Sequence, residues 1–224
     1  MLRGWIAAGW SPSLFTVIDP AAHDLPEEVR QFPSADALDE TFDKVVLGIK
    51  PQMLESLAPD FRPRIATGAL VFSILAGTTT ATLNQHFPQA RIVRLMPNLA
   101  AAMGQSPLGL FSTGLDSDGR QIVDAFLAPL GTPIWIDEEV QMDAVTALAG
   151  SGPAFVYRFI DALAQGGIAT GLPPQISSSL ALATVEGAAR LATASSQSPS
   201  ELAARVTSPG GTTAAGLAVL DAGD

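Results

Sequence analysis

The stretch KVVLGIKPQ, residues 44–52, joins an uninterrupted apolar run to a Lys-Pro-Gln ending. Its apolar residues do not alternate with polar ones, which is typical of a strand covered on both faces. Runs of the same kind recur at residues 14–19, 69–75, 90–96, 108–113 and 132–137. Helices are expected between them at residues 52–58, 79–87 and 116–130. This alternation predicts an α/β fold with a doubly wound parallel sheet.

The second half of the chain changes character after Asp137, where the strand-like runs stop. Segments rich in Ala and Leu follow, and helices are expected at residues 138–148, 153–170, 174–194 and 200–205. We therefore expect an α/β domain over residues 1–137 and an all-helical domain over residues 138–224. Helices with so few charges carry more apolar surface than one small domain buries. This predicts a homodimer, or a larger oligomer built from dimers.

The composition of the 224-residue chain excludes several classes of binding partner and several kinds of catalytic site. A formal net charge of −10 argues against nucleic acid and anionic membranes as partners. The absence of cysteine excludes disulfides, thiolate catalysis and cysteine-based metal sites. His23 and His86, the only histidines, lie far apart in the sequence and predict neither a metal site nor a catalytic triad. No apolar stretch is long enough for a signal peptide or a bilayer span, so a cytoplasmic protein is expected.

Ligands of doubly wound sheets bind beyond the carboxyl ends of the strands. Asp19 ends the first apolar run, Lys50 and Pro51 follow the second, Ala76 follows the third and Asn98 follows the fourth. An acidic residue at a strand end is what dinucleotide-binding folds use to hold the adenosine ribose. Each residue taken singly also fits a turn or a helix cap. Their joint position at strand ends favours a dinucleotide site.

A second candidate site lies in VTSPGGTTAAGLAVLD, residues 206–221, where glycines and hydroxyl residues precede an apolar helix. This loop admits two interpretations. In the first, Thr212 or Thr213 caps the helix, and Gly210 and Gly211 form the entry turn. In the second, the free backbone N–H groups hold a ligand anion, because a glycine-rich helix start binds anions through its geometry and dipole. The loop alone favours capping, because capped helices are far commoner.

Five motifs, taken together, resemble a known family. They are VVLGIKPQ, SILAGTT, RLMPN, DAVTALAGSGPAF and RVTSPGGTTAAGL, they occur in this order, and the resemblance covers practically the whole chain. The set resembles pyrroline-5-carboxylate reductase, which reduces the cyclic imine 1-pyrroline-5-carboxylate to L-proline with NADPH or NADH, the last step of proline biosynthesis. The resemblance implies a Rossmann-like sheet followed by a helical dimerisation domain. A protonated C=N accepts a hydride readily, so the reaction needs aligned reactants rather than a metal or a histidine base.

The resemblance also implies roles for individual residues. The substrate loop would consist of Ser208, Gly210, Gly211, Thr212 and Thr213, and Thr213 is the catalytic candidate that hydrogen-bonds the ring nitrogen. Glu139 is a second candidate for the substrate pocket, with a surface acid at a helix start as the alternative. The implied cofactor contacts are Gly48, Ile49, Lys50, Pro51, Ile74, Leu75 and Ala76, with Asn98 near the nicotinamide. Asp19 would favour the 2′-hydroxyl of NADH over the 2′-phosphate of NADPH, because two anions would otherwise meet.

The two ends of the sequence depart from the family pattern. Family members open with a strand and a G-x-G-x-x-G-like loop, whereas MLRGWIAAG resembles the middle of the helix that follows them. We therefore expect the sheet to lack its first strand, and family members usually continue beyond the position of Asp224. Two alternatives stay open: a non-catalytic oligomeric relative that has lost cofactor binding, and a hydroxy-acid or prephenate dehydrogenase. The second is disfavoured, because residues 138–224 contain neither Lys nor His.

Overall fold

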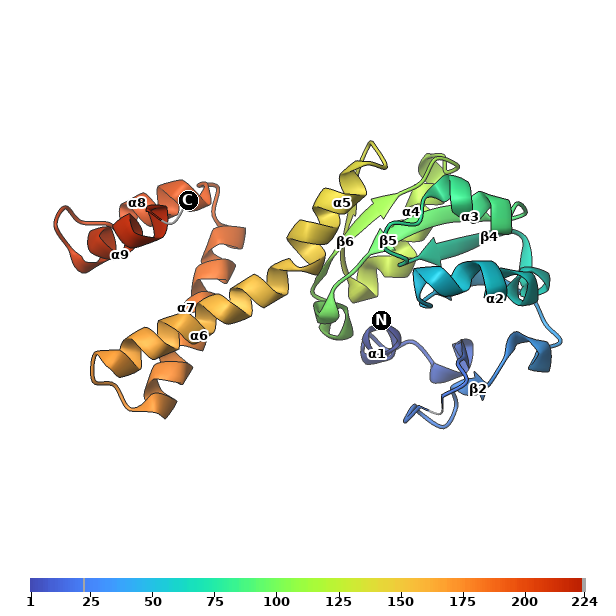
Figure 1. The fold of residues 1–224 in the computed structure, drawn as a ribbon, viewed down its shortest axis with the longest axis horizontal. Helices are drawn as coiled ribbons and strands as arrows, with labels where there is room; N and C mark the ends of the chain where they lie inside the picture. The colour runs from blue at the N-terminus through green and yellow to red at the C-terminus, as the bar shows by residue number, and fades with distance from the viewer. Residues whose placement is uncertain (22, 223–224) are drawn as a thin grey trace. The chain divides into compact units, whose positions relative to one another are not determined.

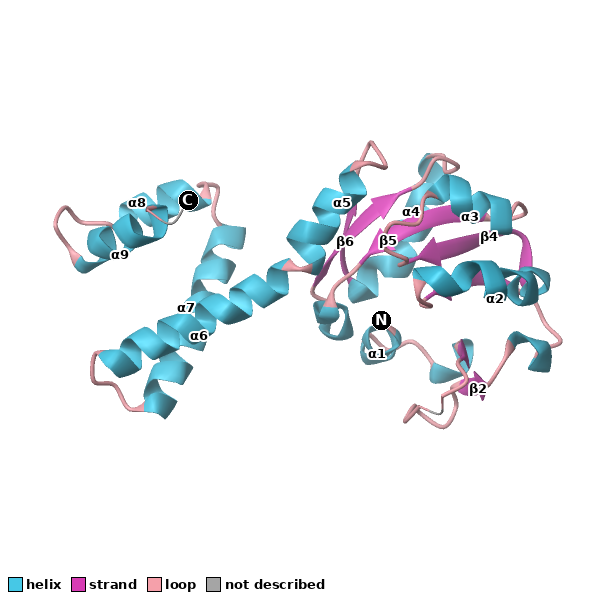
Figure 2. Cartoon of the chain, in the orientation of Figure 1, coloured by secondary structure: helices cyan, strands magenta, loops and turns pink. Residues whose placement is uncertain are grey.

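The computed structural model of the chain describes residues 1–21 and 23–222. It contains two compact units, Met1–Pro153 and Ala154–Asp224. Figure 1 shows the order of the elements along the chain. Figure 2 shows that the first unit combines strands with helices, whereas the described part of the second is helical. The α/β class and the helical second half are confirmed.

The first unit contains a strand that overlaps each of the six predicted apolar runs, and one further strand. The strands are β1 (Thr16–Ile18), β2 (Arg30–Phe32), β3 (Phe42–Leu47), β4 (Ile65–Ser73), β5 (Arg91–Met96), β6 (Ser106–Phe111) and β7 (Gly131–Trp135). The helices are α1 (Leu2–Ala7), α2 (Leu54–Phe61), α3 (Thr80–His86), α4 (Ser117–Leu127) and α5 (Gln141–Val145). The π-helical turn η7 (Thr146–Gly150) follows α5, and α6 (Gly152–Ala169) begins directly after it.

The central sheet has the strand order β3-β4-β5-β6-β7 and separates two hydrophobic cores. In β4, Leu70 and Phe72 enter the core that α1 and α4 complete, whereas Ala69 and Val71 enter the core that α2 and α3 complete. Successive side chains of a strand point to opposite faces. Both faces of β4 are therefore buried, which explains why its sequence reads as a continuous apolar run.

One pair of strands departs from the expected all-parallel sheet. β3, β4 and β5 are parallel neighbours, and so are β6 and β7, but β6 runs antiparallel to β5. Residues 97–105 link β5 to β6 and include the short 3-10 turn η5 (Leu99–Met103). A parallel crossover needs a dozen or more residues. This short link therefore returns the chain in the opposite direction.

A separate parallel pair is formed by β1 and β2. β2 has no signal in the sequence, because Arg-Gln-Phe is short and contains no apolar run. Its Arg30 donates from Nη2 to the Thr16 hydroxyl at 2.6 Å and also pairs with Glu40. Polar contacts on the exposed side of the pair, rather than a buried apolar pattern, mark this strand.

The second unit consists of the rest of α6 with α7 (Pro174–Ala194), α8 (Pro199–Arg205) and α9 (Thr212–Asp221). Small residues let α6 and α7 approach closely. The Ser177 hydroxyl donates to the carbonyl of Ala164 at 2.6 Å, and a Cβ on Gly167 would lie 2.1 Å from that hydroxyl. Ala164 and Ala181 are buried at this crossing. Within the described ranges, no helix combines the length and apolar character that a membrane span requires.

The helix expected at residues 138–148 is α5 followed by the π-helical turn η7, because residues 138–140 form a turn, and both α5 and η7 belong to the first unit. Val145 of α5 contacts the sheet so closely that a Cβ on Gly109 of β6 would lie 2.3 Å from its Cγ1. The division by packing therefore follows Pro153, whereas the composition changes after Asp137. The first helical residues after Asp137 therefore pack against the sheet of the first unit rather than with the helices of the second unit.

Gly131, at the start of β7, tests how tightly β6 and β7 pair. Its φ of 146° is unfavourable for other residues, and a Cβ there would lie 1.9 Å from the Ser106 carbonyl oxygen. We expect Gly131→Ala to lower the free energy of unfolding by about 2–3 kcal/mol in urea titrations. Gly114→Ala is the control, because no heavy atom lies within 4 Å of a Cβ at that position. Equal stability of the two variants would contradict this packing.

Candidate active site

The carboxyl ends of β3, β4 and β5 meet at one edge of the central sheet, because these strands are parallel neighbours. Residues 48–51 leave this edge after β3, residues 74–76 leave it after β4, and Asn98 lies just beyond β5. Asp19, which follows β1, lines the same groove as Gly48 and Ile49. The structure therefore brings the residues predicted to contact the cofactor to one side of the first unit.

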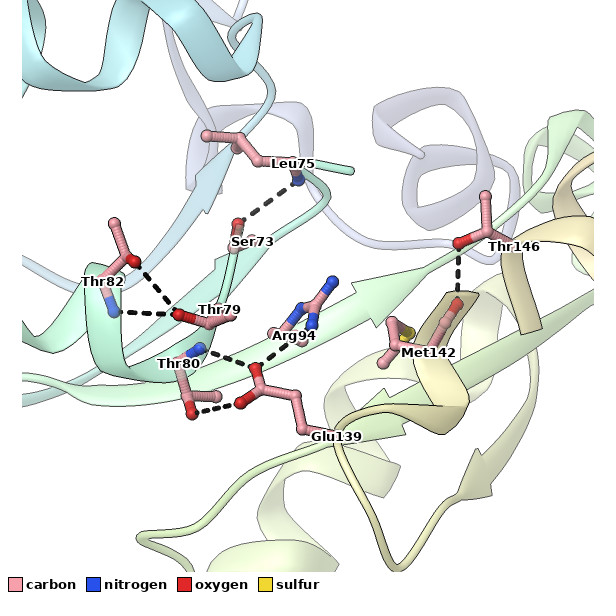
Figure 3. A network of polar contacts seen from close by, with 9 residues as sticks. All are labelled: Ser73, Leu75, Thr79, Thr80, Thr82, Arg94, Glu139, Met142 and Thr146. Atoms are coloured by element: carbon pink, nitrogen blue, oxygen red, sulfur yellow. Dashed lines mark hydrogen bonds and ion pairs between the residues drawn. The ribbon is translucent and has the colours of Figure 1, made fainter. Parts of the chain in front are cut away.

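The turn after β4 is shaped by local hydrogen bonds. The Ser73 hydroxyl accepts from the N–H of Leu75 at 3.3 Å, and Gly77 has a φ of 70°. The Thr79 hydroxyl then caps α3 by accepting from the N–H of Thr82 at 3.2 Å (Figure 3). The turn fixes residues 74–76 at the sheet edge. The cap by Thr79 also satisfies one of the backbone N–H groups at the start of α3.

Glu139 joins three separate segments of the first unit (Figure 3). Its Oε1 accepts from the backbone N–H of Thr80 at 2.6 Å and from Nη1 of Arg94 at 3.1 Å. Its Oε2 accepts from the Thr80 hydroxyl at 3.0 Å. The Arg94 and Glu139 side chains are only 6% and 24% exposed, so the ion pair is largely shielded from water. Glu139 is thus a bridging residue and not an exposed acid at a helix start.

Arg94 and Thr80 complete this network. Arg94 opens the motif RLMPN but receives no role from it, and Thr80 lies just outside the motif SILAGTT. Arg94 leaves a signal in the sequence, because a charge within the apolar run RIVRLM must find a partner if both faces of the strand are covered. The identity of that partner leaves no local signal, because Glu139 lies 45 positions further along the chain.

Asn98 ties the end of β5 to the π-helical turn η7. Its backbone N–H donates to the Ser106 hydroxyl at 2.9 Å, and its Oδ1 accepts from the N–H of Ala100 at 2.9 Å. Its Nδ2 donates to the carbonyl of Ala149, within η7, at 3.0 Å. Turns of this type are frequent at functional sites. Asn98 therefore lies at the predicted cofactor edge while its polar groups hold neighbouring segments in place.

Asp19 is held as an anion by two neighbours. Its Oδ1 accepts from the N–H of Ala21 at 2.8 Å, and its Oδ2 lies 2.9 Å from Nε2 of His23. The hydrogen bond from Ala21, followed by that from His23, lowers the pKa of Asp19 below its ordinary value. The carboxylate is therefore ionised at neutral pH. His23, to which the sequence assigns no role, is a neighbour of this predicted ribose-binding residue.

The predicted substrate loop lies in the second unit, between α8 and α9. Gly210 has a φ of 70°, and the N–H of Gly211 donates to the carbonyl of Ser208 at 3.0 Å, so the two glycines form the entry turn. Gly211 is the N-cap of α9, Thr212 and Thr213 are its first residues, and no side chain caps this start within the described residues. Capping by either threonine, the first interpretation of the sequence, is therefore wrong.

The geometry defines a class of protein. The described residues contain no cluster of three or more His, Cys, Asp or Glu side chains that could hold a metal ion. A parallel strand edge with an ionised carboxylate beside it is the arrangement of dinucleotide-binding sites. The chain is therefore a dinucleotide-binding α/β protein with a helical second unit that carries a glycine-rich loop.

Comparison with known proteins places the chain in a family within this class. Residues 139–224 match the family model described as pyrroline-5-carboxylate reductase dimerisation. The pyrroline-5-carboxylate reductase of Glycine max is 41% identical over 197 residues, which are 87% of this chain and 71% of the relative. That of Pseudomonas aeruginosa is 34% identical over 225 residues, which are 97% of this chain and 82% of the relative. The chain belongs to the pyrroline-5-carboxylate reductase family.

Solved structures agree with this assignment. The pyrroline carboxylate reductase of Plasmodium falciparum, solved with NADP bound, has a TM-score of 0.87 at 27% identity and aligns over 98% of this chain and 84% of its own. The pyrroline-5-carboxylate reductase of Coxiella burnetii has a TM-score of 0.84 at 30% identity and aligns over 99% of this chain and 85% of its own. The resemblance that the five motifs carry is confirmed.

Replacing Glu139 tests how much its network contributes to the free energy of unfolding. Glu139→Ala leaves the Arg94 guanidinium buried without its carboxylate and removes the acceptor of the Thr80 N–H. We expect a loss of about 2–3 kcal/mol in the free energy of unfolding, less than for a fully buried pair because Glu139 keeps some exposure. The exposed neighbour Glu138→Ala is the control, with an expected change within about 0.5 kcal/mol. Equal urea midpoints for the two variants would show that the network does not stabilise the fold.

Proposed function

We propose that this chain reduces 1-pyrroline-5-carboxylate to L-proline with a reduced nicotinamide cofactor. The observation that carries the proposal is the uncapped start of α9 within the motif RVTSPGGTTAAGL, in a chain 41% identical to a named reductase of this substrate class. An uncapped helix start offers backbone N–H groups to an anion. The substrate carries one carboxylate, which can accept hydrogen bonds from these N–H groups.

The glycines of the loop suit close approach of a ligand to the backbone. Gly210 supplies the positive φ that turns the chain into α9. At Gly211 a Cβ would lie 2.4 Å from the Ser208 hydroxyl oxygen and 3.2 Å from the Ser208 carbonyl oxygen, so a side chain there would force the Ser208 hydroxyl to rotate away and would crowd the loop. The first turn of α9 therefore presents its N–H groups without a side chain at the N-cap, and the helix dipole favours a negative charge there.

Thr213 is the residue we propose for the ring nitrogen. In the substrate, the carbon that bears the carboxylate is bonded to the imine nitrogen. A carboxylate bound at the first turn of α9 therefore brings the nitrogen near the hydroxyl of a residue in that same turn. A hydroxyl can donate or accept a hydrogen bond, so it can hold the nitrogen before and after reduction. Its contribution is alignment of the C=N bond.

The residues at the strand edge fit a dinucleotide. Gly48 has no heavy atom within 4 Å of a Cβ position, which leaves room for a ligand near the backbone. The Asp19 carboxylate suits ribose hydroxyls, and the exposed Lys50 supplies a positive charge. The start of α3 is less suited to a phosphate, because Glu139 and Thr79 already take up its N–H groups. A bound reduced nicotinamide would supply a hydride to the carbon of the protonated C=N, whose electron pair moves to nitrogen and gives the amine of proline.

A homodimer is the assembly we propose. The second unit of the single chain exposes large apolar side chains along α6 and α7. They include Phe155, Phe159, Leu163, Ile176, Leu180, Leu182 and Leu191. Exposed apolar surface on this scale indicates an interface, and the family model for this region is described as a dimerisation domain. A larger oligomer built from dimers and a cytoplasmic location are further proposals that rest on the sequence.

Thr213→Ala tests the proposed catalytic contact. If Thr213 holds the ring nitrogen, its replacement removes an aligned hydrogen bond at the reacting centre. The rate of cofactor oxidation with 1-pyrroline-5-carboxylate should then fall by roughly ten- to a hundredfold while Tm changes little, because Thr213 does not cap α9. Thr212→Ala alters the adjacent residue and serves as the control. A Thr213→Ala protein that melts early but turns over normally would assign the residue a structural role only.

Asp19→Ser tests the proposed cofactor preference. The native chain is expected to oxidise NADH faster than NADPH, because the ionised Asp19 would repel a 2′-phosphate. Removing this charge should raise the NADPH-to-NADH rate ratio by about tenfold. Asp24→Ser removes an acid five positions away and is the matched control. An unchanged ratio in the Asp19 variant would exclude this residue from cofactor choice.

A further inference from the structure

The backbone of His23 is fixed by β2, the strand that has no signal in the sequence. The N–H of His23 donates to Oε1 of Gln31 at 3.2 Å, and Nε2 of Gln31 donates back to the His23 carbonyl at 3.2 Å. Gln31 is the register partner of Val17 in β1. The two-stranded sheet therefore holds His23 beside the end of β1, where Asp19 follows.

The His23 imidazole reaches the carboxylate that is predicted to hold the adenosine ribose. Nε2 of His23 lies 2.9 Å from Oδ2 of Asp19, while Oδ1 accepts from the N–H of Ala21 at 2.8 Å. Each carboxylate oxygen keeps a second lone pair for a ligand. The two side chains are 43% and 42% exposed, so both are open to a ligand in solvent. A ribose that hydrogen-bonds Asp19 would therefore lie within reach of the imidazole.

The charge of this pair depends on pH. The hydrogen bond from Ala21, followed by that from His23, lowers the pKa of Asp19, so the carboxylate stays ionised across the range in which histidines titrate. Histidine is the side chain that changes charge between about pH 5 and 8. A neutral imidazole leaves the pair with one net negative charge, whereas an imidazolium leaves it with none. The ribose end of the site therefore gains one positive charge as the pH falls.

Neighbouring charges do not take part in this pair. The charged groups on the surrounding elements are the amino group of Met1, Arg3, Asp24, Glu27, Glu28, Arg30, Glu40, Asp43 and Lys44. Within the described residues, no ion pair joins any of them to Asp19 or His23. Burial lowers the pKa of the Met1 amino group. That group is common to all the proteins compared below, so it does not distinguish them.

The two nicotinamide cofactors differ at the position where this charge acts. NADPH carries a phosphate on the 2′-oxygen of the adenosine ribose, and NADH carries a hydroxyl there. An ionised Asp19 accepts a hydrogen bond from the hydroxyl but repels the phosphate. An imidazolium beside it offsets that repulsion and can donate a charge-assisted hydrogen bond to the phosphate. Each protonation state of His23 therefore suits a different cofactor.

We propose that His23 selects between NADH and NADPH according to pH. With a neutral imidazole, Asp19 holds the 2′-hydroxyl of NADH and excludes the 2′-phosphate. With an imidazolium, the pair carries no net charge and admits the 2′-phosphate, so the affinity for NADPH relative to NADH rises as the pH falls. This inference rests on the proposed function only in requiring a dinucleotide at Asp19, and it does not require hydride transfer to the imine.

Binding measured without substrate tests this selection independently of catalysis. NADH and NADPH are titrated at about pH 6 and about pH 8, with the fluorescence of the bound nicotinamide as the readout. His23→Gln keeps a hydrogen-bond donor but does not titrate. Between the higher and the lower pH, we expect the NADPH-to-NADH affinity ratio to rise about fivefold more in the parent than in this variant, the effect of one unit charge at an exposed site. Protonation of the 2′-phosphate itself acts equally in both proteins.

Two further variants and a pair of fragments complete the test. His86→Gln removes the only other histidine, at the last residue of α3, and should keep the pH dependence of the parent. His23→Arg supplies a permanent positive charge and should raise the ratio at the higher pH about fivefold. Adenosine 5′-monophosphate and adenosine 2′,5′-bisphosphate differ only in the 2′-phosphate. NMR titrations with these fragments repeat the comparison for the adenosine end alone.

Equal pH dependence in the parent and in His23→Gln would overturn the proposal, and so would an unchanged ratio in His23→Arg. Failure of the folded protein to bind either dinucleotide or either fragment would overturn it as well. A protein that reduces the imine while its affinity ratio ignores pH would contradict this inference alone. A protein that shows the expected pH dependence but forms no proline would support this inference and contradict the proposed function instead.

Discussion

The guanidinium of Arg94 lies inside a sheet that is covered on both faces, and a buried charge without a partner is strongly destabilising. Glu139 supplies the opposite charge at 3.1 Å and at the same time binds the first residue of α3. This requirement brings the chain back to the carboxyl edge of the sheet after β7. It places α5 and η7 beside β6 and Asn98, and the helical second half starts from there. The ion pair therefore links α3, β5 and the segment after β7 at the edge where the candidate cofactor residues lie.

The two candidate sites use mostly backbone groups and few reactive side chains. In the first unit, the turns after β3 and β4 present main-chain groups and Asp19 presents an ionised carboxylate. In the second unit, α9 begins without a side-chain cap. Such groups bind and align anions and hydroxyls, but they do not attack or transfer protons. This matches a reaction in which an activated C=N and a hydride donor need only be held together.

The sequence predicts the features that depend on local patterns. Each apolar run contains a strand because both faces of the sheet are buried, and helix α7 has the predicted bounds of residues 174–194 because Pro174 and the Ser-Ser turn mark its ends. Features that depend on contacts between residues distant in the sequence cannot be predicted from local patterns. The antiparallel β6 follows from the short link through η5, β2 is marked by polar contacts alone, and the partner of Arg94 is remote in sequence. The same limit applies to His23, whose contact with Asp19 becomes visible only in three dimensions.

The central claim is that this chain directs a hydride to the imine carbon of 1-pyrroline-5-carboxylate. The most direct measurement is mass spectrometry of the product after incubation with this substrate and NADH fully deuterated at carbon 4 of the nicotinamide ring. The account predicts proline that carries a single deuterium, on the ring carbon formerly double-bonded to nitrogen. Proline without deuterium, or no proline from a folded protein that binds both compounds, would contradict it.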